Sequence, residues 1–426
     1  MFAAENRAFL DRVFTEHSPH DLALARDVCD RHLRDLGFLF PTLSTHFRLD
    51  RTTLDELRSA TARLVSAHRK VMRHVCSSLS TAELAATFRI PEAMAGHIHW
   101  QWMTEGTALA RADIIPTESG YAFCELNTFS GVGGGECQHS ARLHAELLGL
   151  PAAGASPFLD LARHYLTQCT RLGLDRLVIL DSVRHSRRGY GRDQPLVDFL
   201  RIMAPDLDVV YCNETSYRAQ WLRAPHARRI LVHRLITFAD TDDDGAFLKA
   251  VDDSGATVSC MFEAELGMHR KWFSLLCDPD LHHLLDPEEV ETLRHHVPMT
   301  FDLAPDTLDD VLASRGDYVF KHSYTYGGDG VLIGAEHSAP ALRERFVADG
   351  VDTWTCQRMV EASTLELPVA DGPSAEEAGH RKTAEFDFVL GVYAYGDRTN
   401  GALVRGSADS KVVNASRGAI SWAFAD

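Results

Sequence analysis

The sequence predicts a mixed α/β protein of the α+β kind, and three observations lead to this fold class. Apolar residues recur at helical spacing through most of residues 1–110. Short β-prone runs alternate with helical patterns between residues 155 and 260, which is typical of a small parallel sheet. Paired β-prone runs joined by turns that contain glycine occur at residues 111–127 and again at residues 317–334.

Composition and charge restrict the classes of function. The chain has 426 residues, of which 45% are hydrophobic, so two or three domains with a sizeable core are expected. The net charge of −17 argues against a nucleic-acid or anionic-membrane surface, because both partners require a basic stripe. Nine cysteines without C-x-x-C spacing indicate reduced thiols rather than a disulfide or zinc framework. Without a signal-like start or a bilayer-length apolar run, we expect a soluble cytoplasmic protein.

Residues 1–94 are expected to form a helical N-terminal region. Leu54, Leu57, Leu64 and Val71 illustrate the helical spacing of its apolar residues. The sequence leaves the role of this region open between completing an acceptor pocket, covering a site and building a homodimer.

The hairpin at residues 111–127 contains the first group of candidate functional residues. Asp113 and Glu125 are expected on facing strands, and Asn127 projects to the same side as Glu125 because alternate strand residues share a face. Two carboxylates and an amide oxygen suit Mg²⁺, which takes its remaining ligands from water and phosphates. The alternative is a solvated hairpin whose acids only maintain solubility. The loop FSGVGGGE at residues 129–136 then leads into a helix and offers backbone N–H groups to an anion.

An arginine-rich loop follows the first strand of the predicted parallel sheet. That strand is expected at residues 177–180, with further strands at 209–211 and 230–232. The loop at residues 184–192 lies beyond the carboxyl end of the first strand, where open parallel sheets bind ligands. Its arginines could hold carboxylate or phosphate groups bidentately. The alternative is a solvent loop with no specific ligand.

The last third of the chain contains a lysine followed by a glycine-rich turn. Strands are expected at residues 318–320 and 331–333, the first of them followed by Lys321, and the turn between them contains Gly327, Gly328 and Gly330. Such a turn brings backbone N–H groups close to an anion, and the lysine adds a positive charge for a phosphate. An ordinary hairpin is the alternative. Later strands are expected at residues 352–360, 385–394, 402–405 and 411–414.

Together these motifs resemble the ATP-grasp superfamily, and more narrowly its circularly permuted carboxylate–amine ligases. Arg111-Ala112-Asp113, a hairpin and then Glu125-Leu126-Asn127-Thr128 resemble the metal motif of D-alanine–D-alanine ligases. The order is unusual, because the metal motif precedes the lysine hairpin by about two hundred residues. A circular permutation explains this order if a C-terminal strand near residues 411–414 lies beside the hairpin at residues 113–127.

The resemblance implies a domain plan and roles for individual residues. The expected domains are a helical region, a metal-binding part of the ATP-grasp domain, a small α/β substrate domain and a nucleotide-binding part, at residues 1–94, 95–150, 151–260 and 261–426. Asp113, Glu125 and Asn127 would hold Mg²⁺, and Arg111 and Arg405 would act in catalysis. Residues expected to bind ATP are Lys271, Lys321, Tyr326, Gly327, Gly328, Asp329, Gly330, Gln357, Met359 and Val360. Residues expected to bind substrate are Arg184, Arg187, Arg188, Ser130 and Gly131.

The implied activity is ATP- and Mg²⁺-dependent amide bond formation. The substrates would be a small-molecule carboxylate, such as an amino acid or short peptide, and an amine, without nucleic-acid or membrane partners. An acylphosphate would form first, and the amine would then displace phosphate. Two alternatives remain open at this stage: a kinase on the same scaffold, and a non-catalytic nucleotide-binding or interaction module.

Overall fold

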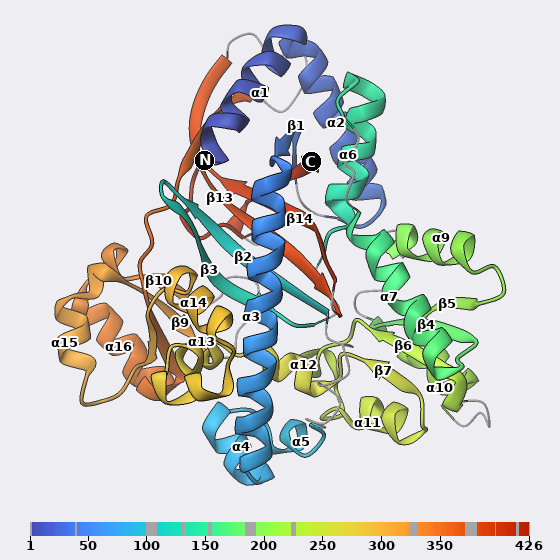
Figure 1. Ribbon diagram of the computed structural model, residues 1–426, viewed down its shortest axis with the longest axis vertical. Coiled ribbons are helices and arrows are strands. Elements are labelled where there is room, and N and C mark those ends of the chain that lie inside the picture. Colours follow the sequence, from blue (N-terminus) through green and yellow to red (C-terminus); the bar gives the residue numbers. More distant parts are fainter. Residues whose placement is uncertain are drawn as a thin grey trace.

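The computed structural model is an α+β fold built around three sheets (Figure 1). It describes residues 2–38, 41–98, 109–129, 131, 133–151, 156–183, 193–222, 227–323, 330–370, 381–396, 398–414 and 417–425. Within these ranges, no helix is both long enough and apolar enough to cross a membrane.

The largest sheet combines both ends of the chain with the hairpin that contains Asp113. Among the described residues its strand order is β1-β15-β14-β13-β2-β3, and β12 also pairs with β13. The strands in chain order are β1 (Thr42–Arg48), β2 (Leu109–Thr117), β3 (Gly120–Asn127), β12 (Thr364–Ala370), β13 (Arg381–Tyr395), β14 (Arg398–Ser407) and β15 (Ile420–Ala425). Antiparallel pairing of β13 with β2 places a strand of the last third of the chain beside the hairpin, but this strand is not the one expected there, at residues 411–414.

Two predictions about this sheet are wrong in detail. Residues 411–414 form bends and irregular backbone, and the last strand is instead β15. The N-terminal region is not entirely helical, because β1 pairs in parallel with β15. Helical periodicity dominates the N-terminal region, so the short strand was not recognised as one.

Helices α1 (Phe2–Glu16), α2 (Pro19–Asp35) and α3 (Arg51–Ser78) of the N-terminal region pack on the large sheet. Helices α4 (Thr81–Phe88) and α5 (Glu92–Ala95) lie at the far end of α3, away from the sheet (Figure 1). Asp50 caps α3 by accepting a hydrogen bond from the Thr53 N–H at 3.0 Å. The long α3 crosses the sheet (Figure 1) and buries Leu54, Leu57 and Leu64 in the main core, as their spacing predicts.

The second sheet is the predicted parallel one. Its order is β5-β4-β6-β7 within the described residues, and every pairing is parallel. Its strands are β4 (Arg176–Asp181), β5 (Asp208–Asn213), β6 (Ile230–Arg234) and β7 (Thr257–Ser259). α6 (Gly135–Leu148) precedes this part in the chain and packs against β15 and α2. The helices of the parallel-sheet part are α7 (Pro157–Leu172), α9 (Gln194–Met203), α10 (Glu214–Gln220) and α11 (Ala246–Asp253).

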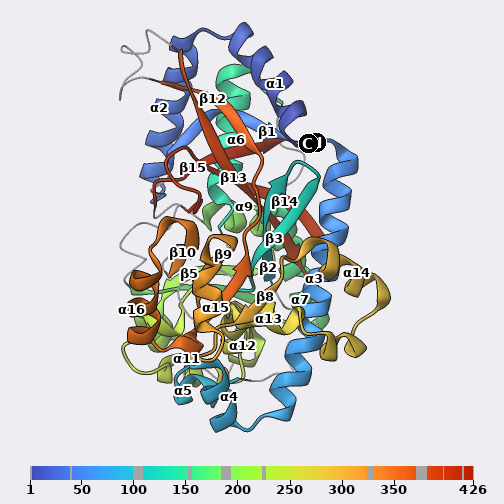
Figure 2. The same ribbon diagram turned by 90° about the vertical axis from the view of Figure 1, so that its left-hand side faces the viewer.

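The third sheet contains the lysine hairpin (Figure 2) and has the order β10-β9-β11-β8 among the described residues. Its strands are β8 (Thr300–Asp302), β9 (Tyr318–His322), β10 (Val331–Ile333) and β11 (Trp354–Arg358). The helices of this part are α12 (Phe262–Gly267), α13 (Lys271–Leu276), α14 (Pro287–His296), α15 (Leu308–Ala313) and α16 (Ala339–Asp349). The chain also has short 3-10 helices at Ala227–Arg229, Phe238–Asp240, Pro279–Leu284, Arg315–Asp317, Gly334–Glu336 and Val351–Thr353. Phe320, Phe346 and Trp354 form much of this sheet's own core.

Candidate functional site

Two arginines hold one buried carboxylate on the face of the large sheet. Arg111 binds Asp113 bidentately, with Nε to Oδ1 at 2.7 Å and Nη2 to Oδ2 at 3.0 Å. Arg405 adds a third hydrogen bond from Nη2 to Oδ2 at 2.7 Å. Burial opposes charge on Asp113, but the two guanidiniums hold the pKa of its carboxyl below the ordinary value. We call Arg111, Asp113 and Arg405 the arginine clamp.

Strand register and a glycine make the arginine clamp sterically feasible. Arg111 lies opposite Asn127 on β3 and Tyr393 on β13, and Asp113 lies opposite Glu125 and Gly391. A Cβ at Gly391 would lie 2.6 Å from Cδ and 2.9 Å from Nε of Arg111. The missing side chain therefore gives the arginine room to reach Asp113.

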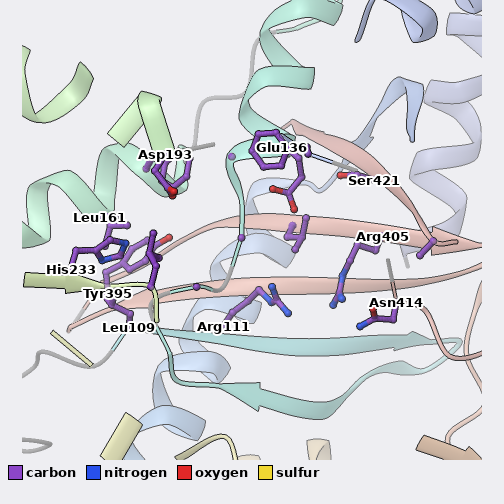
Figure 3. Close-up of a pocket in the computed structure, with 18 of the residues that line it drawn as sticks. Leu109, Arg111, Glu136, Leu161, Asp193, His233, Tyr395, Arg405, Asn414 and Ser421 are labelled. Atoms are coloured by element: carbon purple, nitrogen blue, oxygen red, sulfur yellow. The ribbon is translucent and has the colours of Figure 1, made fainter. Parts of the chain in front are cut away.

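The arginine clamp borders a cavity of about 260 Å³ between the large sheet, the loop at residues 129–136 and the parallel-sheet region (Figure 3). We call this loop the glycine loop and the cavity the glycine-loop cavity. The polar lining of the cavity includes Arg111, Glu136, Asp193, His233 and Arg405. The Nε of Arg405 is buried and has no hydrogen-bond partner among the described residues. The clamp carries two positive charges and one negative charge. A Cβ at Gly133 would lie 3.3 Å from a carboxylate oxygen of Glu136 and 3.8 Å from Nη1 of Arg111, so the buried Glu136 adds a second negative charge nearby.

The glycine loop covers the arginine clamp closely. Gly133 and Gly134 have φ angles of +78° and +113°, which L side chains rarely adopt. A Cβ at Gly134 would lie 2.7 Å from the Tyr393 hydroxyl, so a larger residue does not fit. Glu136 accepts a hydrogen bond from the Gly134 N–H at 3.1 Å and is buried. Gly131 lines the cavity, as expected of a substrate contact, whereas Ser130 lies outside the described residues.

The side chain of Lys321, on β9 of the third sheet, contacts the hairpin formed by β2 and β3. Its Nζ donates to the Cys124 carbonyl at 2.6 Å and to Gln357 Oε1 at 2.7 Å. Desolvation lowers the pKa of Lys321, and nearby Arg270 acts in the same direction. We call the surrounding space the lysine cleft, which is lined by Cys124, Glu125, Leu126, Gly267, Met268, His269, Arg270, Phe273, Thr300, Lys321, Thr355 and Gln357.

The lysine cleft is closed in this structure. Its free volume is about 10 Å³, no more than one water requires. Arg270 lies 3.8 Å from Glu125, and Gln357 donates to Thr300 Oγ1 at 3.1 Å, so side chains fill the space. Binding of a nucleotide therefore requires these side chains to separate.

Four other expected ATP contacts, Lys271, Gly330, Met359 and Val360, are described but are not lining residues of the lysine cleft. Lys271 instead forms an ion pair with Asp302, and the adjacent Arg270 lines the cleft in its place. Met359 and Val360 follow the end of β11 and are partly buried, and the Met359 N–H donates to the Asp317 carbonyl at 2.7 Å.

Several predicted site residues fall outside the described part of the chain. They are Tyr326, Gly327, Gly328 and Asp329 of the glycine turn, and Arg184, Arg187 and Arg188 of the arginine-rich loop. Gly330, which ends the turn, has φ +70° and accepts a hydrogen bond from the His322 N–H at 2.8 Å.

The geometry does not support the expected three-ligand magnesium site. Asp113 already accepts three hydrogen bonds from arginines, and Asn127 donates to it at 3.4 Å. The two guanidiniums would repel a cation at this carboxylate. Within the described ranges, no group of three or more His, Cys, Asp or Glu side chains could hold a metal. Glu125 and the Asn127 amide oxygen remain as hard oxygen donors.

Sequence reasoning missed several residues that line these spaces. Glu136 ends the glycine loop and Arg270 precedes Lys271, and their charge was the available signal. His233 lies within a strand-like apolar run, and Asn414 ends the strand predicted at residues 411–414. Only folding brings these two residues to the glycine-loop cavity.

The fold is similar to that of a solved structure, a glutathione synthetase-like effector from Globodera pallida in its apo form. The alignment has a TM-score of 0.63 and 10% identity, and it covers 96% of this chain and 97% of the other. At this identity the likeness establishes a shared fold alone, in agreement with the predicted α+β class. No family model matches the chain. No curated protein matches its sequence.

Proposed function

We propose that this protein is an ATP-dependent carboxylate–amine ligase with a circularly permuted ATP-grasp arrangement. A single observation carries the proposal: Lys321, from the third sheet, lies against Cys124 and Glu125 of the hairpin almost two hundred residues earlier. The pairing of β13 with β2 supports the permuted order.

The lysine cleft supplies groups suited to a nucleotide. Lys321 and Arg270 are cations for phosphates, and Gln357 and Thr300 are polar neighbours. Lys321 is desolvated and forms no ion pair with a carboxylate among the described residues. Phosphate oxygens could replace its two hydrogen-bond acceptors, the Cys124 carbonyl and Gln357 Oε1.

Mg²⁺ would be held by Glu125, which lines this cleft, and by Asn127 two residues further along β3, with phosphates and water completing its shell. When bound, the ion would neutralise phosphate charge. Asp113 has a different role in this proposal, because it holds Arg111 and Arg405 in place.

The arginine clamp would act on the reacting carboxylate. Activation of a carboxylate as an acylphosphate and attack by an amine both build negative charge on oxygen. Arg405 has a buried unpartnered Nε at the glycine-loop cavity, and Arg111 is fixed beside it. Preorganised donors of this kind stabilise developing charge without rearrangement.

The test is replacement of Glu125 with Gln, which removes the charge of the proposed metal ligand and keeps its size. ADP release stimulated by a panel of carboxylic acids and amines should fall by about 10²–10³-fold. Glu118→Gln is the matched control, because Glu118 is exposed in the turn of the same hairpin. Equal turnover in both variants would exclude the proposed ligand.

A second candidate is a non-catalytic nucleotide-binding module, and the observation that favours it is that two arginines occupy Asp113, one of the three expected metal ligands. ATP binding without ADP release across the whole panel would support this candidate. Product analysis also separates the ligase from a kinase, because only the ligase releases free phosphate with ADP.

A further inference from the structure

Helix α6 joins the glycine loop to the N-terminal region. The helix begins at Gly135, directly after Gly134, and Glu136 in its first turn accepts the hydrogen bond from the Gly134 N–H. Along its length α6 packs against α2, β1 and β15, and α2 lies beside it in Figure 1. Because the loop continues into the helix without a break, the position of α6 fixes the position of Gly133 and Gly134 over the arginine clamp.

Two buried imidazoles lie at the contact between α6 and β1. The rings of His144 on α6 and His46 on β1 have centres 5.4 Å apart, and these residues are 0% and 1% exposed. Neither ring nitrogen of His144 has a hydrogen-bond partner within the described residues. The Pro151 carbonyl lies near His46 but forms no hydrogen bond of normal geometry with it. Buried polar atoms are normally satisfied, so this pair is an exception that requires a reason.

The surroundings of this pair do not offset a positive charge. Burial lowers the pKa of His46 to about 4 and that of His144 to about 3; Arg48 of β1 acts in the same direction on His46, as His46 does on His144. No acidic side chain in the described part of the chain favours the charged form of either ring. From α2, Asp30 accepts two hydrogen bonds from Thr42 instead, each at 2.8 Å. Strand β15 has no titratable side chain.

A second histidine contact lies where α6 meets α2. Nδ1 of His139 on α6 is hydrogen bonded to Nε2 of His32 on α2 at 3.4 Å. One of these nitrogens must carry a proton and the other must not, so the contact requires at least one neutral ring. Burial and the neighbouring His32 lower the pKa of His139 to about 4, Arg142 acts in the same direction, and Asp198 of α9 opposes them. Acid therefore disfavours both histidine contacts of α6.

We propose that the contact of α6 with α2 and β1 is a pH-sensitive joint. As the pH falls from 7 toward 5, α6 separates from β1 and α2 and releases the glycine loop before the rest of the protein unfolds. The glycine-loop cavity opens as a result. This inference goes beyond the proposed function and does not depend on it, because it concerns only how the loop is held.

Proton uptake by the released histidines drives the separation. An imidazole that reaches water regains its ordinary pKa near 6.5, whereas the packed imidazole stays neutral until the pH falls to its lowered pKa. The packed state is therefore favoured above pH 6.5, and this advantage is lost as the pH falls. Between pH 7 and pH 5, each released histidine shifts the equilibrium toward the open state by about 25-fold. His46 and His144 together should shift it by about 10²–10³-fold.

Hydrogen–deuterium exchange of the full-length protein tests the proposal, with detection by mass spectrometry and correction for the pH dependence of intrinsic exchange. Protection of the α6 amides should fall by at least about 10²-fold between pH 7 and pH 5. Helix α15 is the internal reference, because its buried residues Leu308, Val311 and Leu312 are all apolar, and its protection should fall by less than about tenfold. Equal falls in the two helices would indicate global unfolding and overturn the proposal, and so would a fall of less than about tenfold in α6.

The double variant His46→Leu with His144→Leu removes both buried imidazoles and keeps an apolar contact. Between pH 7 and pH 5, its α6 protection should fall at least about tenfold less than that of the wild type. His295→Gln replaces an exposed histidine of α14 and should keep the wild-type fall. Circular dichroism at pH 7 checks folding, and His144→Leu alone serves if the double variant does not fold. A fall equal to that of the wild type in the folded leucine variant would assign the acid response elsewhere and overturn the proposal.

Discussion

Two buried arginine sites differ in whether their charges are balanced. Arg234 and Glu265 are both fully buried, with Nη1 and Oε1 at 2.5 Å, and Arg234 also donates to the carbonyls of Cys260 and Met261. Its guanidinium lies 4.8 Å from the ring centre of Phe129, which precedes the glycine loop. This site pairs one positive charge with one negative charge.

The arginine clamp contains one more positive charge than negative, and it lies at a cavity rather than inside a core. The difference separates a structural ion pair from a candidate binding site. An ion pair enclosed in the core fixes the chain, whereas arginines that line a cavity can meet a ligand.

The largest expected effect tests the structural side of this comparison. Arg234→Met leaves Glu265 buried without its ionic partner, and we expect a loss of about 3–5 kcal/mol in the free energy of unfolding. Urea denaturation measures it. The double variant Arg234→Met with Glu265→Leu should recover part of the loss, because no unpaired charge remains. A single variant within 1 kcal/mol of the wild type, on the order of a surface substitution, would contradict a structural role.

The next effect tests the catalytic side. Arg405→Met should reduce acid-stimulated ADP release by about 10²–10³-fold, because it removes the donor with an unpartnered Nε. Its unfolding free energy should fall less than that of Arg234→Met, since Arg111 keeps both hydrogen bonds to Asp113. Steady-state kinetics and urea denaturation on the same samples provide the check. Full activity together with a large loss of unfolding free energy would show that Arg405, like Arg234, has a structural role.

A third kind of buried site contains histidines that are neutral in the folded protein, and low pH tests it. His46 and His144 pack with ring centres 5.4 Å apart, and burial lowers their pKa values to about 4 and about 3. Their unfolded pKa is near 6.5, so their contribution to stability is present above that pH and is lost as pH falls toward the folded values. By pH 5 each histidine should cost about 2 kcal/mol of unfolding free energy.

The matched variants for this acid effect are His144→Leu and His295→Gln. The first should reduce the loss of stability between pH 7 and pH 5 by about 2 kcal/mol. The second replaces an exposed histidine and should leave the loss unchanged. Identical pH profiles for all three proteins, measured by urea denaturation, would show that His144 is not buried as a neutral group.

The smallest effect tests how tightly the arginine clamp is packed. Gly391→Ala places a methyl group against Arg111 and should cost about 1–3 kcal/mol of unfolding free energy. Gly406→Ala on the neighbouring β14 is the control, because its nearest contacts are at 3.4 Å. Thermal denaturation compares the two variants. Equal melting temperatures would mean that Arg111 moves aside without strain.

Local patterns predicted much of the fold but less of the candidate site. The spacing of Arg111, Asp113, Glu125 and Asn127 predicted a hairpin whose register the structure confirms, because strand alternation is local. The same residues were expected to surround a metal. Arg405 reaches Asp113 from a strand almost three hundred residues later, and no local pattern could indicate that its guanidinium occupies the carboxylate.

The sequence by itself determined much of the order of helices and strands, the parallel second sheet and the two glycine-containing hairpins, because periodicity and turn chemistry act between near neighbours. Only the tertiary structure decided which charges meet. It placed two arginines on Asp113, His233 at the glycine-loop cavity and Lys321 against Cys124. Electrostatic contacts depend on distance in space and on burial, and both are set by the packing of distant segments.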